Sequence, residues 1–596
     1  MSVISRKRSL LLPILLIGLL LTVFTGCGKS GGQSMKPGTY EGEAEGMNGP
    51  LKVSVKVSED KIEDIEILSS EETGALTEEV FRQLREGIIG QQGLTCDAVS
   101  GASTTTEAYI QAVSDAVVKA GATLKNFKAV KLSLDDGVRI DRTDFDVIVV
   151  GAGGAGYSAA ITAAENGADV LMLEKMAVTG GNTLISGSAI AAPGNDLQKK
   201  EGIEDSADQL YEDILKGGDN KNDPELVRVL ADGALPAYEW LRDDLGVKFE
   251  DHLLFFGGHS VKRSPVPLGG SGEETIRKMR AKAASLGITV YTGTKATALV
   301  KDDAGKVSKV EAEHGGEQHV FTAKKGIVLA TGGFGSNLEM RKKYDPSMDE
   351  KILSTDSVGT TGDGIQMAEM LGADLVDMQY IQTYPTCHPD TGRLLYVGDV
   401  RLMGRGILVN KEGNRFVEEL ERRDVISKAT ADQTGGCSYL FWDEDAMKDS
   451  KVGSIYKNEY NSLLKAGVLH KADSIEEVAE AAGVDPAQLQ KTVDRFNGFA
   501  KAGVDEDFHY EKRKPPVAFT EGPYYIMRSK PAVHHTMGGI RINAEAQVLD
   551  KDGKPIQGLY AAGETTGHIH GTNRLGSVAI ADIVVFGRIA GKGASE

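Results

Sequence analysis

One stretch of the chain restricts its fold more than any other: an apolar run that ends in three spaced glycines. Residues 144–150 read Asp-Phe-Asp-Val-Ile-Val-Val, which is typical of a buried strand, and Gly151, Gly153 and Gly156 follow directly. An Ala-rich helical segment comes next. Glycines at this spacing allow a tight turn, a close approach of backbone to a pyrophosphate, and close packing of the helix on the strand. The pattern therefore predicts an α/β domain with a Rossmann-like parallel sheet that binds a dinucleotide.

The following strand supports this prediction. Residues 170–173 form a second apolar run that ends at Glu174, 18 residues after Gly156. A carboxylate at the end of the second strand is positioned to bind a ribose hydroxyl. We expect Gly154, in the same turn, to lie close to the cofactor as well.

Composition limits the functional classes. A chain of 596 residues predicts two or three domains. Its net charge of −19, from 67 basic and 86 acidic residues, argues against nucleic acid and against an anionic membrane surface as partners. The four cysteines form no CxxC or CxxCH pattern, so c-type haem is not expected and flavin is expected to carry the electrons. We predict no metal site.

The N-terminus has the features of an export signal. Arg6, Lys7 and Arg8 precede an apolar run over residues 10–24, and the run ends at a lipobox-like Phe-Thr-Gly-Cys sequence with Cys27 last. We expect residues 1–27 to be a lipoprotein signal peptide, with lipidation of Cys27 and a tether over residues 28–35. The mature protein would then be anchored to the outer face of the cytoplasmic membrane. An uncleaved anchor and a plain secreted form are the alternatives.

A small α+β domain is predicted over residues 36–122. Residues 51–57 alternate apolar and polar side chains as a half-buried strand does, and residues 77–89 have helical periodicity. Residues 97–106 then read Asp-Ala-Val-Ser-Gly-Ala-Ser-Thr-Thr-Thr. We expect the Gly/Ala turn to present a hydroxyl ahead of a helix that begins near Glu107, whose N-terminus favours a phosphate. An ordinary Ser/Thr N-cap is the alternative.

This segment resembles the FMN-binding domain of bacterial respiratory flavoproteins. The resemblance implies that a flavin transferase esterifies the FMN phosphate to Ser103, with Thr104 and then Thr106 as second choices. It therefore implies covalent FMN.

The rest of the chain, from about residue 143, resembles the fumarate reductase/flavocytochrome c family, whose members bind FAD non-covalently. Motifs that carry this resemblance supply the expected FAD contacts Gly181, Asn182 and Thr183; Gly332 and Gly333; Asp363; Glu564; and Ser577, Ala579 and Ile580. The family architecture implies a linker over residues 123–142, an FAD-binding domain over 143–255 and 373–596, and an inserted α+β clamp domain over 256–372. The clamp is expected to close over the substrate and exclude water.

Two C-terminal motifs of the same family indicate the reaction. Val-His-His-Thr-Met-Gly-Gly contains His535, and His-Gly-Thr-Asn-Arg-Leu-Gly contains Arg574. By resemblance, these two side chains bind the carboxylate of an unsaturated acid. A His and an Arg can hold a carboxylate by charge-assisted hydrogen bonds.

The resemblance also assigns a proton donor. Hydride passes from FAD N5 to the β carbon, and an Arg donates a proton to the α carbon. Arg423 is the predicted donor because the family has an Arg directly before an Asp, with Arg422 as the neighbour it could be confused with. Arg401 matches the Arg that returns the proton. Structural ion pairs are the alternative role of Arg423 and Arg401.

The far end of the substrate site departs from the fumarate reductases. Where these enzymes have His-Pro-Thr, this chain has Tyr384-Pro385-Thr386, and Asp399 lies one position beyond the family glutamate. Tyr384 with Asp399 resembles urocanate reductases, in which this pair holds the imidazole ring. An aspartate can accept from a ring N–H, and a tyrosine can donate to the other nitrogen. Fumarate and cinnamate- or acrylate-type acids remain alternative substrates.

We therefore predict an enzyme that reduces urocanate to imidazole propionate as an anaerobic terminal electron acceptor. A membrane quinol-oxidising partner or an extracellular carrier would supply the electrons through FMN to FAD. The alternatives from other classes are a 3-ketosteroid-type dehydrogenase and a non-catalytic electron-transfer flavoprotein.

Overall fold

The computed structural model describes residues 35–46, 50–70, 75–96, 103–124, 127–130, 138–509 and 516–596. The predicted signal peptide, Cys27 and the tether up to residue 34 lie outside the described residues. Within the described ranges, no helix is both long enough and apolar enough to cross a membrane.

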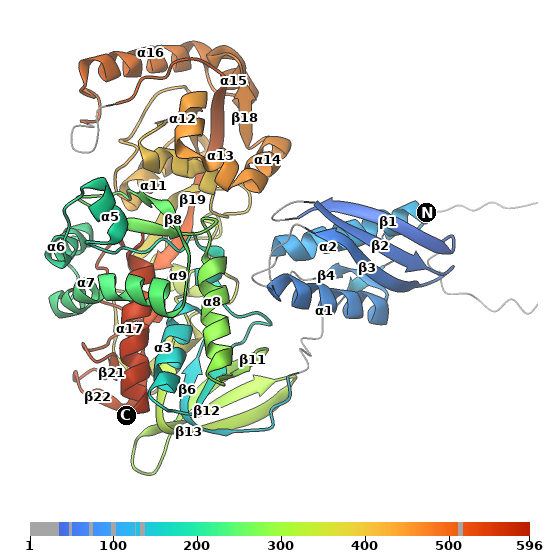
Figure 1. Cartoon of the computed structure of the whole chain (residues 1–596), viewed down its shortest axis with the longest axis vertical. Coiled ribbons are helices and arrows are strands. Elements are labelled where there is room, and N and C mark those ends of the chain that lie inside the picture. The colour runs from blue at the N-terminus through green and yellow to red at the C-terminus, as the bar shows by residue number, and fades with distance from the viewer. Residues whose placement is uncertain are drawn as a thin grey trace, which may run out of the picture.

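The small domain is a three-stranded antiparallel sheet packed on two helices (Figure 1). Its elements are β1 (Gly38–Glu45), β2 (Pro50–Val57), β3 (Ile62–Ser70), α1 (Ala75–Gln91), β4 (Gly93–Cys96), α2 (Ser103–Lys119) and β5 (Lys128–Val130). The predicted strand over 51–57 and helix over 77–89 are both confirmed. Alternate residues of β2 are buried because one face of the sheet packs on the helices.

Two details of this domain differ from prediction. Helix α2 begins at Ser103 rather than near Glu107, so Ser103 is its first residue rather than part of a turn ahead of it. The domain also extends beyond residue 122, because β5 pairs with β4 and Phe127 belongs to the small domain's core. Ala177 and Val178 of the large domain pack against this same core.

The large domain has an eight-stranded sheet with a parallel centre. Its path is β10-β7-β6-β13-β12-β11, and β22 pairs with β13 and β21. The strands are β6 (Asp144–Val150), β7 (Val170–Leu173), β10 (Thr289–Tyr291), β11 (Thr294–Lys301), β12 (Val307–His314), β13 (Glu317–Leu329), β21 (Gln547–Leu549) and β22 (Pro555–Ala561). The predicted parallel sheet is confirmed, since β6 pairs in parallel with both β7 and β13.

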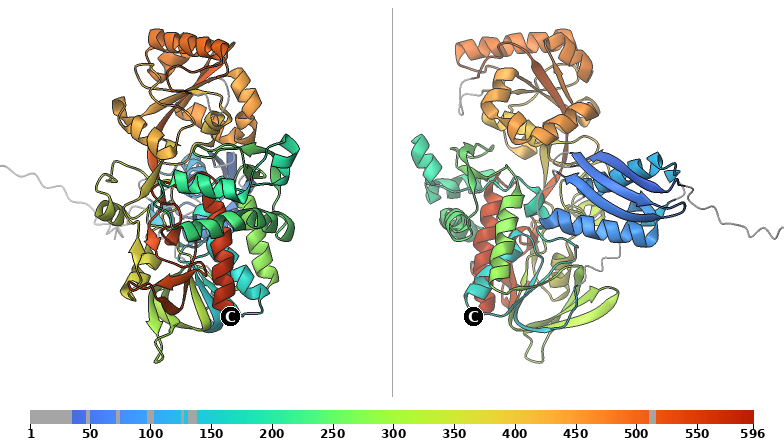
Figure 2. Two further views of the ribbon diagram at one scale, coloured as in Figure 1. Left: turned by 90° about the vertical axis from the view of Figure 1, so that its left-hand side faces the viewer. Right: turned by 45° about the vertical axis from the view of Figure 1, so that its right-hand side comes forward.

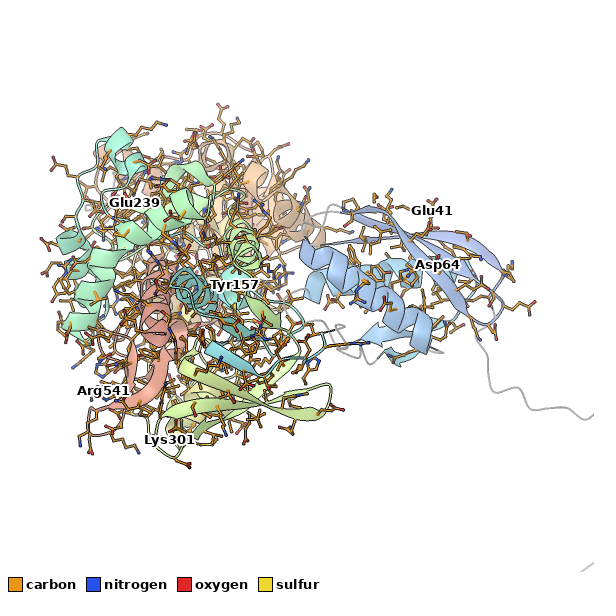
Figure 3. All side chains as sticks on the ribbon, turned by 60° about the horizontal axis from the view of Figure 1, so that its bottom comes forward. Glu41, Asp64, Tyr157, Glu239, Lys301 and Arg541 are labelled. Carbon is orange, nitrogen blue, oxygen red and sulfur yellow. The ribbon has the colours of Figure 1, made fainter. Side chains whose placement is uncertain are left out.

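Helices cover this sheet. The long C-terminal helix α17 (Val578–Ser595) packs on α3 (Gly154–Glu165) and α7 (Pro224–Glu239), and α8 (Gly272–Ser285) packs on α3. In Figure 3 the labelled Tyr157 of α3 lies inside the large domain, whereas Glu239, Lys301 and Arg541 lie nearer its periphery. The remaining helices and strands described in the large domain are α4 (Gly181–Ile185), α5 (Asp196–Glu201), α6 (Ala207–Gly217), the π-helix η2 (Trp240–Asp244), β8 (Phe249–Leu254), β9 (Ser264–Pro267), α9 (Leu338–Tyr344), α10 (Asp363–Met370), β14 (Leu375–Val376), β20 (Gly539–Ile540) and the 3₁₀ helix η6 (Gly563–Thr565).

A second sheet forms the inserted domain, defined here as residues 381–536. Its strand order is β15-β19-β17-β16, with β18 also paired to β19. The elements are β15 (Ile381–Cys387), the 3₁₀ helix η3 (Tyr396–Met403), β16 (Ile407–Val409), α11 (Arg423–Ala431), β17 (Ser438–Asp443), α12 (Glu444–Ser450), α13 (Val452–Ile455), α14 (Lys457–Ala466), β18 (Leu469–Ala472), α15 (Ile475–Ala482), α16 (Pro486–Ala502) and β19 (Tyr524–Thr536). Figure 2 shows this domain stacked on one end of the large domain.

The clamp predicted over residues 256–372 is therefore wrong. Strands β10 to β13, all within that range, belong to the large sheet. The second sheet is built instead from 381–536, which the prediction assigned to the FAD-binding domain. The reason for the error lies in strands β11 and β12, which alternate buried and exposed residues because one face of this antiparallel part of the sheet is solvated. The strands of a separate α+β domain have the same pattern.

Candidate active site

The turn after β6 has the geometry that a dinucleotide requires. Gly151 has a φ of 102°, and a Cβ on it would lie 2.3 Å from the carbonyl oxygen of Ala330. A Cβ on Gly156 would lie 1.9 Å from the carbonyl oxygen of Gly151, so the helix can pack here only without a side chain. A Cβ on Gly153 would meet only the Gly180 carbonyl oxygen, at 3.9 Å. The middle glycine therefore leaves open space beside the N-terminus of α3, where a pyrophosphate fits.

This space is one end of a cavity that we call the nucleotide cavity. Its lining includes most of the predicted FAD contacts: Gly151, Gly153, Gly154, Glu174, Gly181, Asn182, Thr183, Gly332, Asp363 and Glu564. Asp363 forms an ion pair of 2.6 Å with Lys175, and both line the cavity. Gly333 does not line it. A Cβ on Gly333 would lie 2.0 Å from Thr536 Oγ1, so this glycine instead allows two segments to pack behind the wall.

Glu174 is buried at the edge of the nucleotide cavity. Its carboxylate accepts hydrogen bonds from the backbone N–H of Ala152 at 2.9 Å and of Met176 at 2.8 Å, and burial raises its pKa. It therefore holds the glycine turn. Its binding to a ribose stays a prediction.

A second cavity, the catalytic cavity, adjoins the first. The two share Asn182, Thr183, Glu564 and Ile583, so an extended dinucleotide can run from one to the other. The predicted contacts Ser577, Ala579 and Ile580 line the catalytic cavity at the start of α17. The residues that line the two adjoining cavities thus fit FAD, and Ser577, Ala579 and Ile580 would hold its flavin end.

His535 and Arg574 meet in the catalytic cavity, although they come from β19 and from the loop before α17. Burial and the nearby Arg574 hold the pKa of His535 well below its usual range, so this imidazole is neutral. Its Nε2 and the Nε of Arg574 are buried without a hydrogen-bond partner among the described residues. The two can therefore hold a carboxylate, with the neutral histidine contributing a hydrogen bond and the arginine the charge.

The structure separates the two neighbouring arginines. Arg423 lines the catalytic cavity, and its guanidinium lies over the rings of Tyr384, at 4.6 Å, and Phe256, at 5.4 Å. Its Nη1 is buried and makes no hydrogen bond to any residue in the described part of the chain. Arg422 instead points outward and forms ion pairs with Asp219 and Asp424. Arg423 is thus the cation that faces a ligand.

Burial lowers the pKa of both Arg423 and Arg574; the charge of Arg401 lowers that of Arg423 further, and the charge of Arg423 lowers that of Arg574. A guanidinium does not lose its proton under ordinary conditions. The lowered pKa values therefore indicate that the cavity disfavours two uncompensated cations, and a bound carboxylate would offset that cost. The cavity is suited to an anionic ligand.

Tyr384 and Asp399 line the same cavity, from β15 and η3. Burial raises the pKa of Asp399 to about 7, while Arg401 and Arg423 act in the opposite direction. Burial and Asp399 also raise the pKa of Tyr384, which keeps it a phenol. Arg401 does not line the cavity. It is buried behind it and donates a hydrogen bond to the carbonyl oxygen of Glu419.

Sequence reasoning missed several residues of the catalytic cavity. His534 lies with its ring 5.1 Å from that of Tyr384, and its Nδ1 is 2.8 Å from Thr355 Oγ1. Tyr396 and Tyr456 stack at 5.3 Å on the wall beside Asp399. The His-His pair was a signal for His534, since both histidines of the motif were visible. The two tyrosines gave no signal distinct from ordinary core aromatics.

The predicted FMN site is only partly described. Ser103 is the first residue of α2, and the side chains of Ser103 and Thr104 lie outside the described residues. Thr106, one turn into the helix, is fully buried, and its hydroxyl has no hydrogen-bond partner within the described ranges. The acceptor assignment stays a prediction.

Comparisons with known proteins agree with this architecture. Residues 146–580 match the FAD binding domain family, and residues 46–118 match the FMN-binding domain family. The chain is 48% identical to urocanate reductase of Eggerthella lenta, over 93% of this chain and 92% of that protein. It is 40% identical to a fumarate reductase (cytochrome) of Shewanella frigidimarina, over 76% of this chain and 77% of that protein.

A solved structure has the same fold. The open conformation of a flavocytochrome c3 fumarate reductase superposes with a TM-score of 0.63 at 38% identity, over 78% of this chain and 82% of that one. The chain therefore belongs to the fumarate reductase/flavocytochrome c family of FAD-dependent oxidoreductases, and it carries an FMN-binding domain in addition.

Proposed function

We propose that this protein reduces the carbon–carbon double bond of urocanate and forms imidazole propionate. The observation that carries the proposal is that Tyr384 and Asp399 line the same cavity as His535 and Arg574. One pair supplies an acceptor and a donor for the two nitrogens of an imidazole ring, and the other binds a carboxylate. The similarity to the Eggerthella lenta urocanate reductase supports the same substrate.

Charge disfavours fumarate. Two like charges about 4 Å apart at an effective dielectric constant of about 20 repel by about 4 kcal/mol, or about a thousandfold in affinity. The second carboxylate of fumarate would meet the carboxyl group of Asp399, which lies inside the catalytic cavity and is therefore poorly screened by solvent. A ring N–H would instead stabilise the ionised form of Asp399. Cinnamate- and acrylate-type acids lack the second charge, but they leave Asp399 without a partner, which is unfavourable in a buried site.

The side chains divide the reaction between them. Bound FAD would supply the hydride, which adds to the carbon β to the carboxylate. His535 and Arg574 hold the carboxylate and fix which carbon faces the flavin. Arg423 donates a proton to the α carbon, so that one hydride and one proton are added across the double bond. The apolar side chains of Leu254, Phe256 and Val266 help to exclude water from the cavity.

Arginine needs a partner to act as an acid, because the guanidinium pKa is above about 12. A relay must return the proton as it leaves. Arg401 lies near Arg423, since its charge lowers the pKa of Arg423. We infer that Arg401 returns the proton to Arg423.

Electrons would reach FAD through FMN on Ser103. A flavin transferase would attach the FMN, and a membrane quinol-oxidising partner or an extracellular carrier would reduce it. A lipid on Cys27 would keep the protein on the outer face of the cytoplasmic membrane, near such a donor. The reaction would then dispose of respiratory electrons without oxygen.

The first test is anaerobic oxidation of a reduced viologen dye by the purified holoprotein, with urocanate, fumarate and a cinnamate compared side by side. We expect rapid turnover with urocanate alone. Turnover with fumarate or a cinnamate in its place would overturn the substrate but not the family's reaction.

The pH dependence of urocanate reduction reports on Asp399. Burial raises its pKa to about 7, so its carboxylate forms as the pH rises through that value. Since the carboxylate is the form that accepts a ring N–H, we expect kcat/KM to rise across this range. The Asp399→Asn variant should lose this limb. A limb that persists in the variant would assign the titration to another group.

The flavin on Ser103 can be tested independently of turnover. When the protein is made together with a flavin transferase and then denatured, we expect flavin fluorescence to stay with the polypeptide. Ser103→Ala should remove that fluorescence, and Thr104→Ala should leave it unchanged. The reverse result would move the attachment to Thr104.

A further inference from the structure

The loop between α6 and α7 has an unusual backbone conformation at two adjacent residues. Asp219 and Asn220 have φ values of 55° and 53°, so two consecutive residues other than glycine occupy the left-handed region. Such conformations are unfavourable and persist only where surrounding contacts hold them. The contacts that hold this loop show what it connects.

The loop is joined to the segment that carries Arg574. Thr572 donates its backbone N–H to the carbonyl oxygen of Gly218 at 3.1 Å. The side chain of Asn573 donates to the carbonyl oxygen of Gly217 at 3.2 Å, and that of Asn222 donates to the carbonyl oxygen of Ile569 at 2.9 Å. The loop and the segment before Arg574 both belong to the large domain, and these hydrogen bonds hold them together as one unit.

The carboxylate of Asp219 reaches from this unit to the inserted domain. It accepts two hydrogen bonds from Arg422, at 2.6 Å to Oδ1 and 3.2 Å to Oδ2. Its Oδ2 also accepts the hydroxyl of Thr572 at 2.5 Å. One side chain therefore contacts the residue directly before Arg423 and the residue two positions before Arg574.

The segments that carry Arg422 and Thr572 are also closely packed near Asp219. A Cβ on Gly257 would lie 2.4 Å from the carbonyl oxygen of Glu421, and a Cβ on Gly258 would lie 2.4 Å from Leu575 Cδ2. The segment before Arg423 and the segment after Arg574 thus both pack closely against one glycine pair. Asp219 is the polar link across this contact.

We propose that Asp219 is a positioning residue for the reaction, which rests on the proposed function of Arg423 and Arg574. Its carboxylate sets the position of the proton donor, in the inserted domain, relative to the carboxylate-binding arginine, in the large domain. The Asp219 side chain is 49% exposed, and an ion pair so accessible to solvent adds little to stability. Its effect acts through geometry instead, since a displacement of about 1 Å can reduce a rate by about a hundredfold.

The two contacts of Asp219 predict different kinetic effects. Arg422 directly precedes the proton donor Arg423, which acts in the chemical step. Thr572 is two residues before the carboxylate-binding Arg574, which acts in binding as well. Loss of the Arg422 contact should therefore lower kcat more than it raises KM, and loss of the Thr572 contact should mainly raise KM.

The experiment measures kcat and KM of the holoprotein with whichever enoate the wild type reduces fastest, so that a wrong substrate assignment does not affect the result. Asp219→Asn removes the charge that pairs with Arg422 and keeps an oxygen for Thr572. We expect kcat to fall about tenfold with little change in KM. Asp219→Glu should recover most of kcat. Thr572→Val should raise KM about tenfold with a smaller change in kcat.

Asp208→Asn serves as the matched control, because Asp208 is exposed, forms an ion pair with Arg228 within the large domain and lines neither cavity. It should leave kcat, KM and the FAD content unchanged. Wild-type kcat and KM in Asp219→Asn would overturn the proposal. So would equal losses in both parameters together with loss of FAD or a lower Tm, since that result assigns Asp219 a general structural role.

Discussion

Replacing Arg423 with glutamine is expected to lower kcat for enoate reduction by about a thousandfold, within the range of general acid catalysis. Glutamine keeps much of the side-chain volume but cannot deliver a proton with the driving force of a cation in contact with a relay. The carboxylate would still bind to His535 and Arg574, so KM should change much less. The measurement is steady-state oxidation of a reduced viologen dye, with flavin content checked by absorbance.

Arg528→Gln is the control for this experiment. Arg528 forms a solvent-exposed ion pair with Asp390 in the inserted domain and does not line either cavity. It should reduce dye oxidation little or not at all. If Arg423→Gln kept near wild-type kcat, the proton donor would have to be another group, and the cation over Tyr384 would have only an electrostatic role.

Local sequence patterns predicted the core of the fold because each of them is compatible with only one type of local structure. The run over 144–150 and the glycines after it predicted β6 and the turn before α3, and both are where the spacing required. Domain boundaries were less predictable. Strands β11 and β12 have one solvated face, and nothing in their sequence says whether such strands extend a parallel sheet or form another domain. Strand pairing across long separations decides this.

In the catalytic cavity, too, the sequence predicted which residues are present but not all of their roles. His535, Arg574, Arg423, Tyr384 and Asp399 were predicted from motifs, and all five line one cavity. Motifs could not distinguish roles that depend on the neighbouring segments. Arg422 and Arg423 are adjacent in sequence, and only the fold shows that one pairs with Asp219 while the other faces the cavity. Nor did the sequence show that His535 is neutral, since burial and Arg574 together lower its pKa.

The proposed substrate leads to the sharpest test of specificity. Asp399→Asn removes the only acidic side chain that we assign to the ring, and asparagine keeps its size. We expect kcat/KM for urocanate to fall by about a hundredfold, because a buried polar contact to the ring is weakened. We expect kcat/KM for fumarate to rise, by up to about a thousandfold if the like-charge repulsion is relieved in full. The ratio between the two substrates should therefore change far more than either rate alone.

Tyr384 provides the complementary change. Tyr384→His in the Asp399→Asn background restores a histidine at the position where fumarate reductases have one, and it should favour fumarate further. Both variants should retain FAD, because neither residue lines the nucleotide cavity. If the urocanate-to-fumarate ratio of kcat/KM stayed unchanged in both variants, Tyr384 and Asp399 would not bind the substrate ring. The basis of discrimination would then have to lie elsewhere in the cavity, with the stacked Tyr396 and Tyr456 as the next residues to replace.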